Sequence, residues 1–264
     1  MKTVLLLVHD DAGQEARLQA ALDLTRALNG HLRCVDVTPV ATFAGDIDGA
    51  AQAMILAEER KVEAANRIAL STRLTHEQAP WDWIDVTGDI ARCLMREAGL
   101  ADLIVVNCKR DRVLDVEPRG VVSDVVTQSR CPVVAVPDTV RGIDVSGPAV
   151  VAWDGSPAVM ATLRGGAPLL KLAASVEIFA VGDPEGAPAE AAAVYLSRHD
   201  IDATVRRVPA SDRPDAQILE ECAAVGAGYC LMGAFGHGRR REELFGGVTR
   251  RMLDAAQLPL LLGR

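Results

Sequence analysis

Short apolar runs of strand length alternate with longer amphipathic stretches along the whole chain. The apolar runs lie near residues 3–8, 31–37, 82–86, 102–107 and 132–136, and again near 148–153, 175–181, 202–208, 228–232 and 259–263. Between these runs, apolar residues recur at helical spacing. Strands that alternate with helices predict βαβ units and a parallel sheet, and right-handed crossovers place helices on both faces. The pattern therefore predicts an α/β fold.

The same pattern occurs twice. Each copy opens on an apolar run that ends in an aspartate, at Asp10 and at Asp154. In each copy the second run ends 27 residues after this aspartate, at Val37 and at Val181. Each copy also closes on a strand that a proline introduces. We therefore predict an internal duplication, with five strands in each copy.

The two copies differ in length mainly between their second and fourth strands. The additional residues of the first copy fall around 50–75, where Ala, Met, Ile and Leu recur at helical spacing and predict a long helix. The polar stretch 137–148 contains glycine and proline and is the predicted linker. The predicted domains are residues 1–138 and 148–264. Parallel sheets of this kind bind ligands beyond the carboxyl ends of their strands.

The composition excludes several classes of partner. The 264 residues are 49% apolar and only 3% aromatic, with a net charge of −8. No run of Lys or Arg is long enough to hold a phosphate backbone, so we expect no nucleic-acid partner. No segment reaches 18 apolar residues, so we expect no membrane span. We interpret the short apolar run at the N-terminus as a buried strand rather than a signal peptide, and we expect a cytoplasmic protein.

Six cysteines occur without a CxxC motif, and no histidine lies at zinc-ligand spacing from them. Most lie in apolar runs, where a free cysteine behaves as a small hydrophobic residue. We predict core thiols in a reducing compartment and no metal site, with a redox or metal role as the alternative.

A glycine-rich stretch follows the fourth strand of the second copy. Gly233, Gly236, Gly246 and Gly247 have the spacing G-x2-G-x9-G-G, and His237 lies on the same loop. Glycines at a strand end and at a helix start let backbone N–H groups approach an anion, and the helix dipole adds its positive end. The stretch therefore predicts a site for a phosphate chain. The structural alternative is that these glycines only turn the chain.

This stretch resembles the G-x2-G-x9-G-(S/T) nucleotide motif of the universal stress protein family, and the resemblance extends over the chain as two copies. It implies two flavodoxin-like (adenine nucleotide alpha hydrolase-like) domains. It also implies that the second copy binds ATP, with Mg²⁺ arriving on the phosphates. The nucleotide-binding residues that it implies are Asp154, Val181, Gly233, Gly236, His237, Gly246, Gly247, Val248 and Thr249.

The motif departs from the family pattern at one position. Gly247 stands where the family has Ser or Thr, and the loss of one hydrogen bond to a charged group costs roughly 1.5–3 kcal/mol. Thr249 is a candidate to compensate in part. Asp154 also has a structural interpretation, as the N-cap of the following helix, although Ser156 can fill that position instead.

The first copy lacks the motif. Asn107-Cys108-Lys109-Arg110 replaces Gly-x2-Gly, and only Gly120 remains of the four glycines. Asp10 and Val37 remain, with ordinary roles as helix cap and core residue. We predict that this copy binds no nucleotide, or that it binds something else. By the resemblance, it pairs with the second copy through the last strands, 132–136 and 259–263.

The first hypothesis for function is a stress-response regulatory protein that binds ATP in its second copy and presents an ordered loop to an unidentified protein partner. The alternatives are a scaffold of the same fold without nucleotide, and a slow ATPase. No G-x-S-x-G motif, P-loop or general base stands out in the sequence, so we expect at most weak ATPase activity. Homodimer formation stays open.

Overall fold

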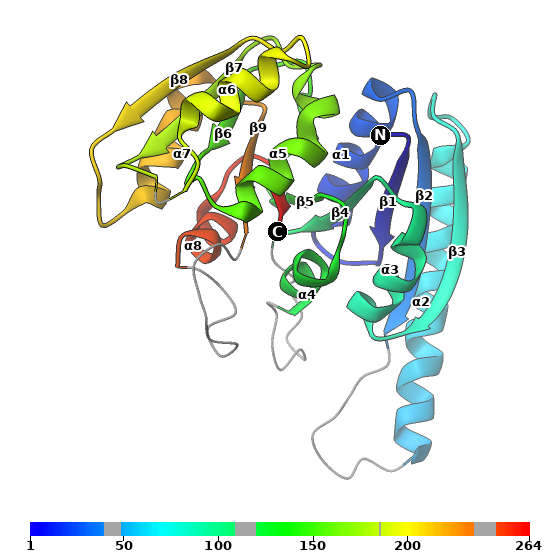
Figure 1. The fold of residues 1–264 in the computed structure, drawn as a ribbon. Helices are drawn as coiled ribbons and strands as arrows, with labels where there is room; N and C mark the ends of the chain where they lie inside the picture. The colour runs from blue at the N-terminus through cyan, green and yellow to red at the C-terminus, as the bar shows by residue number, and fades with distance from the viewer. Residues whose placement is uncertain (40–48, 109–119, 185, 235–246) are drawn as a thin grey trace.

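The computed structural model describes residues 1–39, 49–108, 120–184, 186–234 and 247–264. Within these residues, the N-terminal half contains five strands, four α-helices and a short 3₁₀ turn, and Figure 1 shows how they are arranged. Their order is β1 (Thr3–Val8), α1 (Gln14–Ala27), β2 (His31–Pro39), α2 (Gly49–Leu74), β3 (Trp81–Gly88), α3 (Ile90–Glu97), η1 (Ala98–Leu100), β4 (Leu103–Asn107), α4 (Gly120–Gln128) and β5 (Val133–Val136).

The C-terminal half repeats this alternation. Its elements are β6 (Ala149–Ala152), α5 (Pro157–Leu170), β7 (Val176–Val181), α6 (Ala189–Ser197), β8 (Ala203–Val208), α7 (Pro214–Val225), β9 (Tyr229–Gly233), α8 (Gly247–Ala255) and β10 (Leu260–Gly263). Each of the ten strands expected from the sequence is present, within a residue or two of its predicted ends.

The strands form one sheet in the order β3-β2-β1-β4-β5-β10-β9-β6-β7-β8. Within each half all neighbouring strands are parallel, so each half contributes the five parallel strands expected from the sequence to this one sheet. The halves join where β5 and β10 pair antiparallel, with Leu261 opposite Val134. The last strands therefore connect the copies, as the resemblance implied.

Two apolar layers cover the faces of the sheet, and each layer runs through both halves. One contains Leu18 of α1 and Val159 of α5, together with side chains of α2 and α6. The other contains Ile90 of α3 and Met252 of α8, together with side chains of α4 and α7. Strands β4, β5 and β6 are buried along their whole length, as expected for parallel strands covered on both sides. Helices therefore lie on both faces.

Helix α2 is the long helix that the sequence predicts at 50–75. It has 26 residues, and in Figure 1 its N-terminal part extends past the end of the sheet. Met54 is 75% exposed and Ile68 is 70% exposed. The buried residues in its described part, 53–74, are Glu63, Leu70 and Leu74. Only a narrow stripe of this helix therefore contacts the body of the protein.

The linker between the halves has no helix or strand but is packed against the protein. Ile143 and Val145 are buried, and the Ile143 N–H donates to Asp23 of α1 at 3.1 Å. All six cysteines are free thiols, and five of them are buried, as expected for core residues. Within the described residues, no helix is both long and apolar enough to cross a membrane.

Candidate functional site

The carboxyl ends of β6, β7 and β9 meet at one edge of the C-terminal sheet. Ala152, the last residue of β6, is opposite Phe179 of β7 and Met232 of β9. Asp154 and Val181 each follow this pair by two residues, so they lie in register on neighbouring strands. Gly233 ends β9 on the other side of β6. Three of the predicted nucleotide contacts therefore come to the same edge.

The turn after β6 is built by two side chains with separate tasks. The Asp154 carboxylate accepts a hydrogen bond from the Ser156 N–H at 2.9 Å. The Ser156 hydroxyl accepts one from the Val159 N–H at 3.2 Å and is the N-cap of α5, with Pro157 following at the first helical position. The cap interpretation of Asp154 is therefore wrong, because Ser156 has that role.

The segment after β7 rests on this turn. Gly155 has a φ of +74°, and a Cβ on Gly186 would lie 2.1 Å from the Gly155 carbonyl oxygen. The Ala187 N–H donates to the Gly155 carbonyl at 3.1 Å, and the Trp153 Nε1–H donates to the Ala187 carbonyl at 2.8 Å. These contacts fix the backbone beside Asp154. Sequence reasoning missed them because two distant glycines form no recognisable motif.

Gly233 has a structural reason to lack a side chain. A Cβ at this position would lie 2.6 Å from the backbone nitrogen of Val159, in the first turn of α5. Real Cβ contacts are longer, so the strand and the helix can approach this closely only at a glycine. The structural alternative for this residue is thus supported, and it does not exclude a role in ligand binding.

Helix α8 opens at Gly247. Gly247 is exposed, Val248 is half-buried and Thr249 is buried. A Cβ on Gly247 would lie 3.0 Å from Nη1 of Arg251, whose Nε donates to the buried Asp215 of α7 at 2.6 Å. A guanidinium group therefore lies beside the start of this helix.

Asp215 holds Arg251 in place. Burial alone raises the pKa of this carboxyl, but hydrogen bonds from Arg213 and Arg251 outweigh burial and lower it. Asp215 is therefore a charged partner of Arg251 at neutral pH. The remaining predicted contacts, Gly236, His237 and Gly246, lie outside the described residues.

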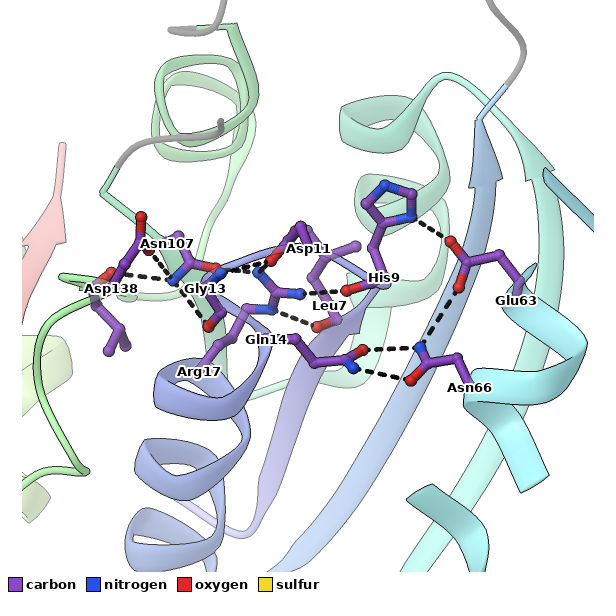
Figure 2. A network of polar contacts seen from close by, with 11 residues as sticks. Leu7, His9, Asp11, Gly13, Gln14, Arg17, Glu63, Asn66, Asn107 and Asp138 are labelled. Atoms are coloured by element: carbon purple, nitrogen blue, oxygen red, sulfur yellow. Dashed lines mark hydrogen bonds and ion pairs between the residues drawn. The ribbon is translucent and has the colours of Figure 1, made fainter. Parts of the chain in front are cut away.

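In the N-terminal half, protein side chains occupy the corresponding edge of the sheet (Figure 2). Arg17 of α1 is completely buried, and its guanidinium donates to the Leu7 carbonyl at 2.7 Å and to the His9 carbonyl at 3.0 Å. It also donates to the Asp11 carboxylate at 3.2 Å and to the Asn107 side-chain oxygen. Burial lowers the pKa of Arg17, and the Asp11 carboxylate opposes this effect.

Asn107 takes the place of Gly233. Both end the fourth strand of their half, Asn107 opposite Val136 and Gly233 opposite Gly263. The Asn107 side-chain nitrogen donates to the Gly13 carbonyl at 3.1 Å and to the Asp138 carboxylate at 2.7 Å (Figure 2). The edge that would receive a ligand is therefore crossed by a hydrogen-bonded network.

The strand register corrects the alignment of Asp10 with Asp154. Val8 is opposite Asp36, so the next residue, His9, takes the position opposite Val37. His9 therefore corresponds to Asp154, and Asp10 is exposed. Asp10 does not cap α1 either, because the N-cap is Gly13. The turn after β1 is longer than the turn after β6, and alignment on the aspartates alone hides that difference.

Two doubly wound halves of this kind, joined through their last strands, define a tandem α/β protein. A family model described as the universal stress protein family matches residues 1–137, and the chain belongs to this family. The matched region is the half whose sheet edge is filled by Arg17 and Asn107.

Solved structures share the fold over nearly the whole chain. A universal stress protein from Archaeoglobus fulgidus DSM 4304 is 15% identical, with a TM-score of 0.72 over 99% of this chain and 96% of its own. A putative universal stress protein from Pseudomonas aeruginosa UCBPP-PA14 is 14% identical, with a TM-score of 0.61 over 100% of this chain and 93% of its own. At these identities the similarity shows the fold. No curated protein matches the chain significantly.

Proposed function

We propose that the C-terminal half binds ATP at the carboxyl edge of β6, β7 and β9, and that the protein is a stress-response regulator rather than an enzyme. Asp154 and Val181 would hold adenosine. The backbone of the glycine-rich stretch from Gly233 to Gly247 would hold the phosphates, with Mg²⁺ bound mainly by phosphate oxygens. We also keep the cytoplasmic location as a prediction.

The observation that carries the proposal is the register of Asp154 and Val181. The two residues are 27 positions apart in the sequence, yet they lie at matching positions on adjacent parallel strands. Between them, the contacts of Gly155 with Ala187 hold the turn in one conformation. A preformed edge of this kind reduces the ordering cost of binding a small ligand.

The N-cap of α5 is Ser156, so the position of Asp154 at this edge is not set by a helix-capping role. The N-terminal half lacks this arrangement, since the histidine at the corresponding position is buried and Arg17 crosses the edge. A single nucleotide site per chain, in the C-terminal half, is therefore the stoichiometry that the proposal requires.

Isothermal titration calorimetry with ATP and Mg²⁺ tests the proposal on the full chain. We expect one site per chain, and we expect Asp154→Ala to weaken binding about 10- to 150-fold, since a hydrogen bond to a charged group is lost. Asp10→Ala is the matched control, because Asp10 is exposed at the equivalent turn of the other half, and it leaves the affinity unchanged. Absence of heat at millimolar ATP, or an Asp154→Ala protein that binds normally, would falsify the proposal.

Gly247→Ser sharpens the same experiment. This change introduces the hydroxyl that the family motif carries at this position, and among the described residues the nearest atoms to the new Cβ belong to the guanidinium end of Arg251. We expect ATP to bind more tightly, by up to the same factor. An unchanged affinity would mean that the phosphates do not reach the start of α8.

A further inference from the structure

Three buried titratable side chains meet where α2 crosses the N-terminal sheet. His9 follows β1, Asp36 lies on β2 and Glu63 lies on α2, and these residues are 0%, 4% and 3% exposed. Nδ1 of His9 lies 2.5 Å from Oε1 of Glu63 (Figure 2). The nucleotide proposal uses none of these groups, and no simple packing argument explains three ionisable groups in one buried cluster.

Glu63 is one of the few residues through which α2 contacts the rest of the N-terminal half. Leu70 and Leu74 bury the C-terminal end of this helix in the apolar layer. Two turns earlier, Glu63 is the remaining buried residue of segment 53–74, and the residues before it are exposed or half-buried. At Glu63, the contact of the helix with the body of the protein is therefore polar.

The cluster contains more negative than positive groups. Oδ1 of Asp36 is buried without a hydrogen-bond partner among the described residues, and Glu63 is close enough to affect the pKa of Asp36. Burial, followed by the negative charges of Glu63 and Asp85, raises the pKa of Asp36 to about 7, while Arg67 opposes the shift. At neutral pH, loss of this proton leaves two carboxylates together in a buried place with one imidazole.

The other groups around the cluster do not neutralise that second charge. On α1, Arg17 is held by Asp11, and Gln14 forms a reciprocal amide pair with Asn66 of α2 at 2.8 Å (Figure 2). The Asn66 side chain also donates to Glu63 at 3.4 Å.

On the remaining side, Arg67 of α2 is paired with Asp85 of β3, and both are about half exposed. Cys34, the neighbour on β2, has its pKa raised by burial to about 12, so it stays neutral. Arg17 and Arg67 are therefore both paired with carboxylates other than that of Asp36.

We propose that His9, Asp36 and Glu63 form a proton-controlled latch that fastens the middle of α2 to the N-terminal sheet and loosens as the pH rises above neutral. Below pH 7, the shared proton joins Asp36 to Glu63, and Glu63 pairs with His9. Above pH 7, Asp36 and Glu63 repel each other. The carboxyl has a higher pKa in the docked state than in an open state, so the docked state is favoured at low pH and loses this advantage as the pH passes 7.

Hydrogen exchange of the full chain, followed by mass spectrometry at pH 6, 7 and 8 and corrected for intrinsic exchange, tests the latch. With one carboxyl that titrates near pH 7 when docked and near 4 when open, protection of the segment 53–74 falls about tenfold between pH 6 and pH 8. Peptides from α5 are the internal reference, and their protection stays constant. Equal protection of α2 at pH 6 and pH 8, or an equal loss in α5, would overturn the proposal.

Two variants separate the latch from general packing. Asp36→Asn keeps a neutral hydrogen-bond donor beside Glu63, so we expect α2 to stay protected at both pH values. Glu63→Gln removes the second carboxylate and also abolishes the pH dependence, whether or not it weakens docking. Glu58→Gln changes an exposed carboxylate of the same helix, paired with Lys61, and keeps the tenfold change. A pH dependence that survives in both Asp36→Asn and Glu63→Gln contradicts the latch.

Discussion

The two halves place a side chain on opposite sides of the same close contact. In the N-terminal half the helix cap is Gly13 and the strand end is Asn107, and a Cβ on Gly13 would lie 2.4 Å from the Asn107 side-chain nitrogen. In the C-terminal half the helix cap is Ser156 and the strand end is Gly233, whose Cβ would collide with the first turn of α5. In each half, a Cβ added to the glycine would meet the facing element, which is the Asn107 side chain in one half and the α5 backbone in the other. A glycine at either position is therefore a requirement of packing as well as a candidate ligand contact.

The different positions of the glycine in the two halves also affect the sheet edge. Arg17 is four residues after its helix cap, and the residue four after Ser156 is Met160, which is half-buried against the apolar layer. The N-terminal half thus needs a buried guanidinium to satisfy Asn107 and two backbone carbonyls. The C-terminal half has neither the arginine nor the asparagine, so no guanidinium from that position crosses the edge.

The largest expected effect comes from making the N-terminal half resemble the C-terminal half at one position only. Arg17→Met leaves the Leu7 and His9 carbonyls and the Asn107 oxygen without their donor, and it leaves Asp11 without its cation. Removing one partner of a buried charged network costs about 3–5 kcal/mol. Urea unfolding measures the loss in the free energy of unfolding.

Met160→Leu is the matched control for this experiment in the other half. It is a volume-conserving apolar change and costs less than about 1.5 kcal/mol. If Arg17→Met costs no more than Met160→Leu, the network contributes nothing to stability and the comparison between the halves fails.

The second prediction concerns the close contact itself. Gly233→Ala places a Cβ 2.6 Å from the Val159 nitrogen, and backbone cannot give way as a side chain can. Overpacking of this kind costs about 1–3 kcal/mol. Gly99→Ala is the control, since a Cβ there meets no atom of the described residues within 4 Å, and it is neutral or stabilising by up to about 1 kcal/mol. Equal thermal shifts for the two variants would contradict the steric argument. For the same reason, loss of ATP binding in Gly233→Ala would not by itself prove a ligand contact.

The fold could be predicted from the sequence because parallel strands buried on both faces leave continuous apolar runs. The apolar runs of β1 and β9 are typical of such buried strands. Polar residues or glycine mark where these runs end. The long helix α2 was predicted from its helical periodicity, although its exposed Met54 and Ile68 do not face the core. Periodicity shows that a helix forms and not which part of it is buried.

The site could be predicted only in part. Asp154, Val181 and Gly233 stand at strand ends, and strand ends are visible in the sequence. The Asp10 alignment was wrong because hydrogen-bond register depends on turn length, which a shared aspartate conceals. The latch of His9, Asp36 and Glu63 was missed because its members are far apart in the sequence and meet only when α2 crosses the sheet.

The smallest expected effect tests the helix cap alone. Ser156→Ala removes the hydroxyl that accepts from the Val159 N–H, and such a loss costs about 1 kcal/mol. Ser156→Gly costs only a few tenths of a kcal/mol, because glycine leaves the helix N-terminus open to water. The N-terminal half already begins its first helix at Gly13 without a side-chain cap, so glycine is compatible with this contact. If Ser156→Gly proves as costly as Ser156→Ala in urea unfolding, then the two helix starts are not interchangeable. In that case Gly13 is required only by the bulk of Asn107. The two halves would then correspond in their strands but not in the way their first helices begin.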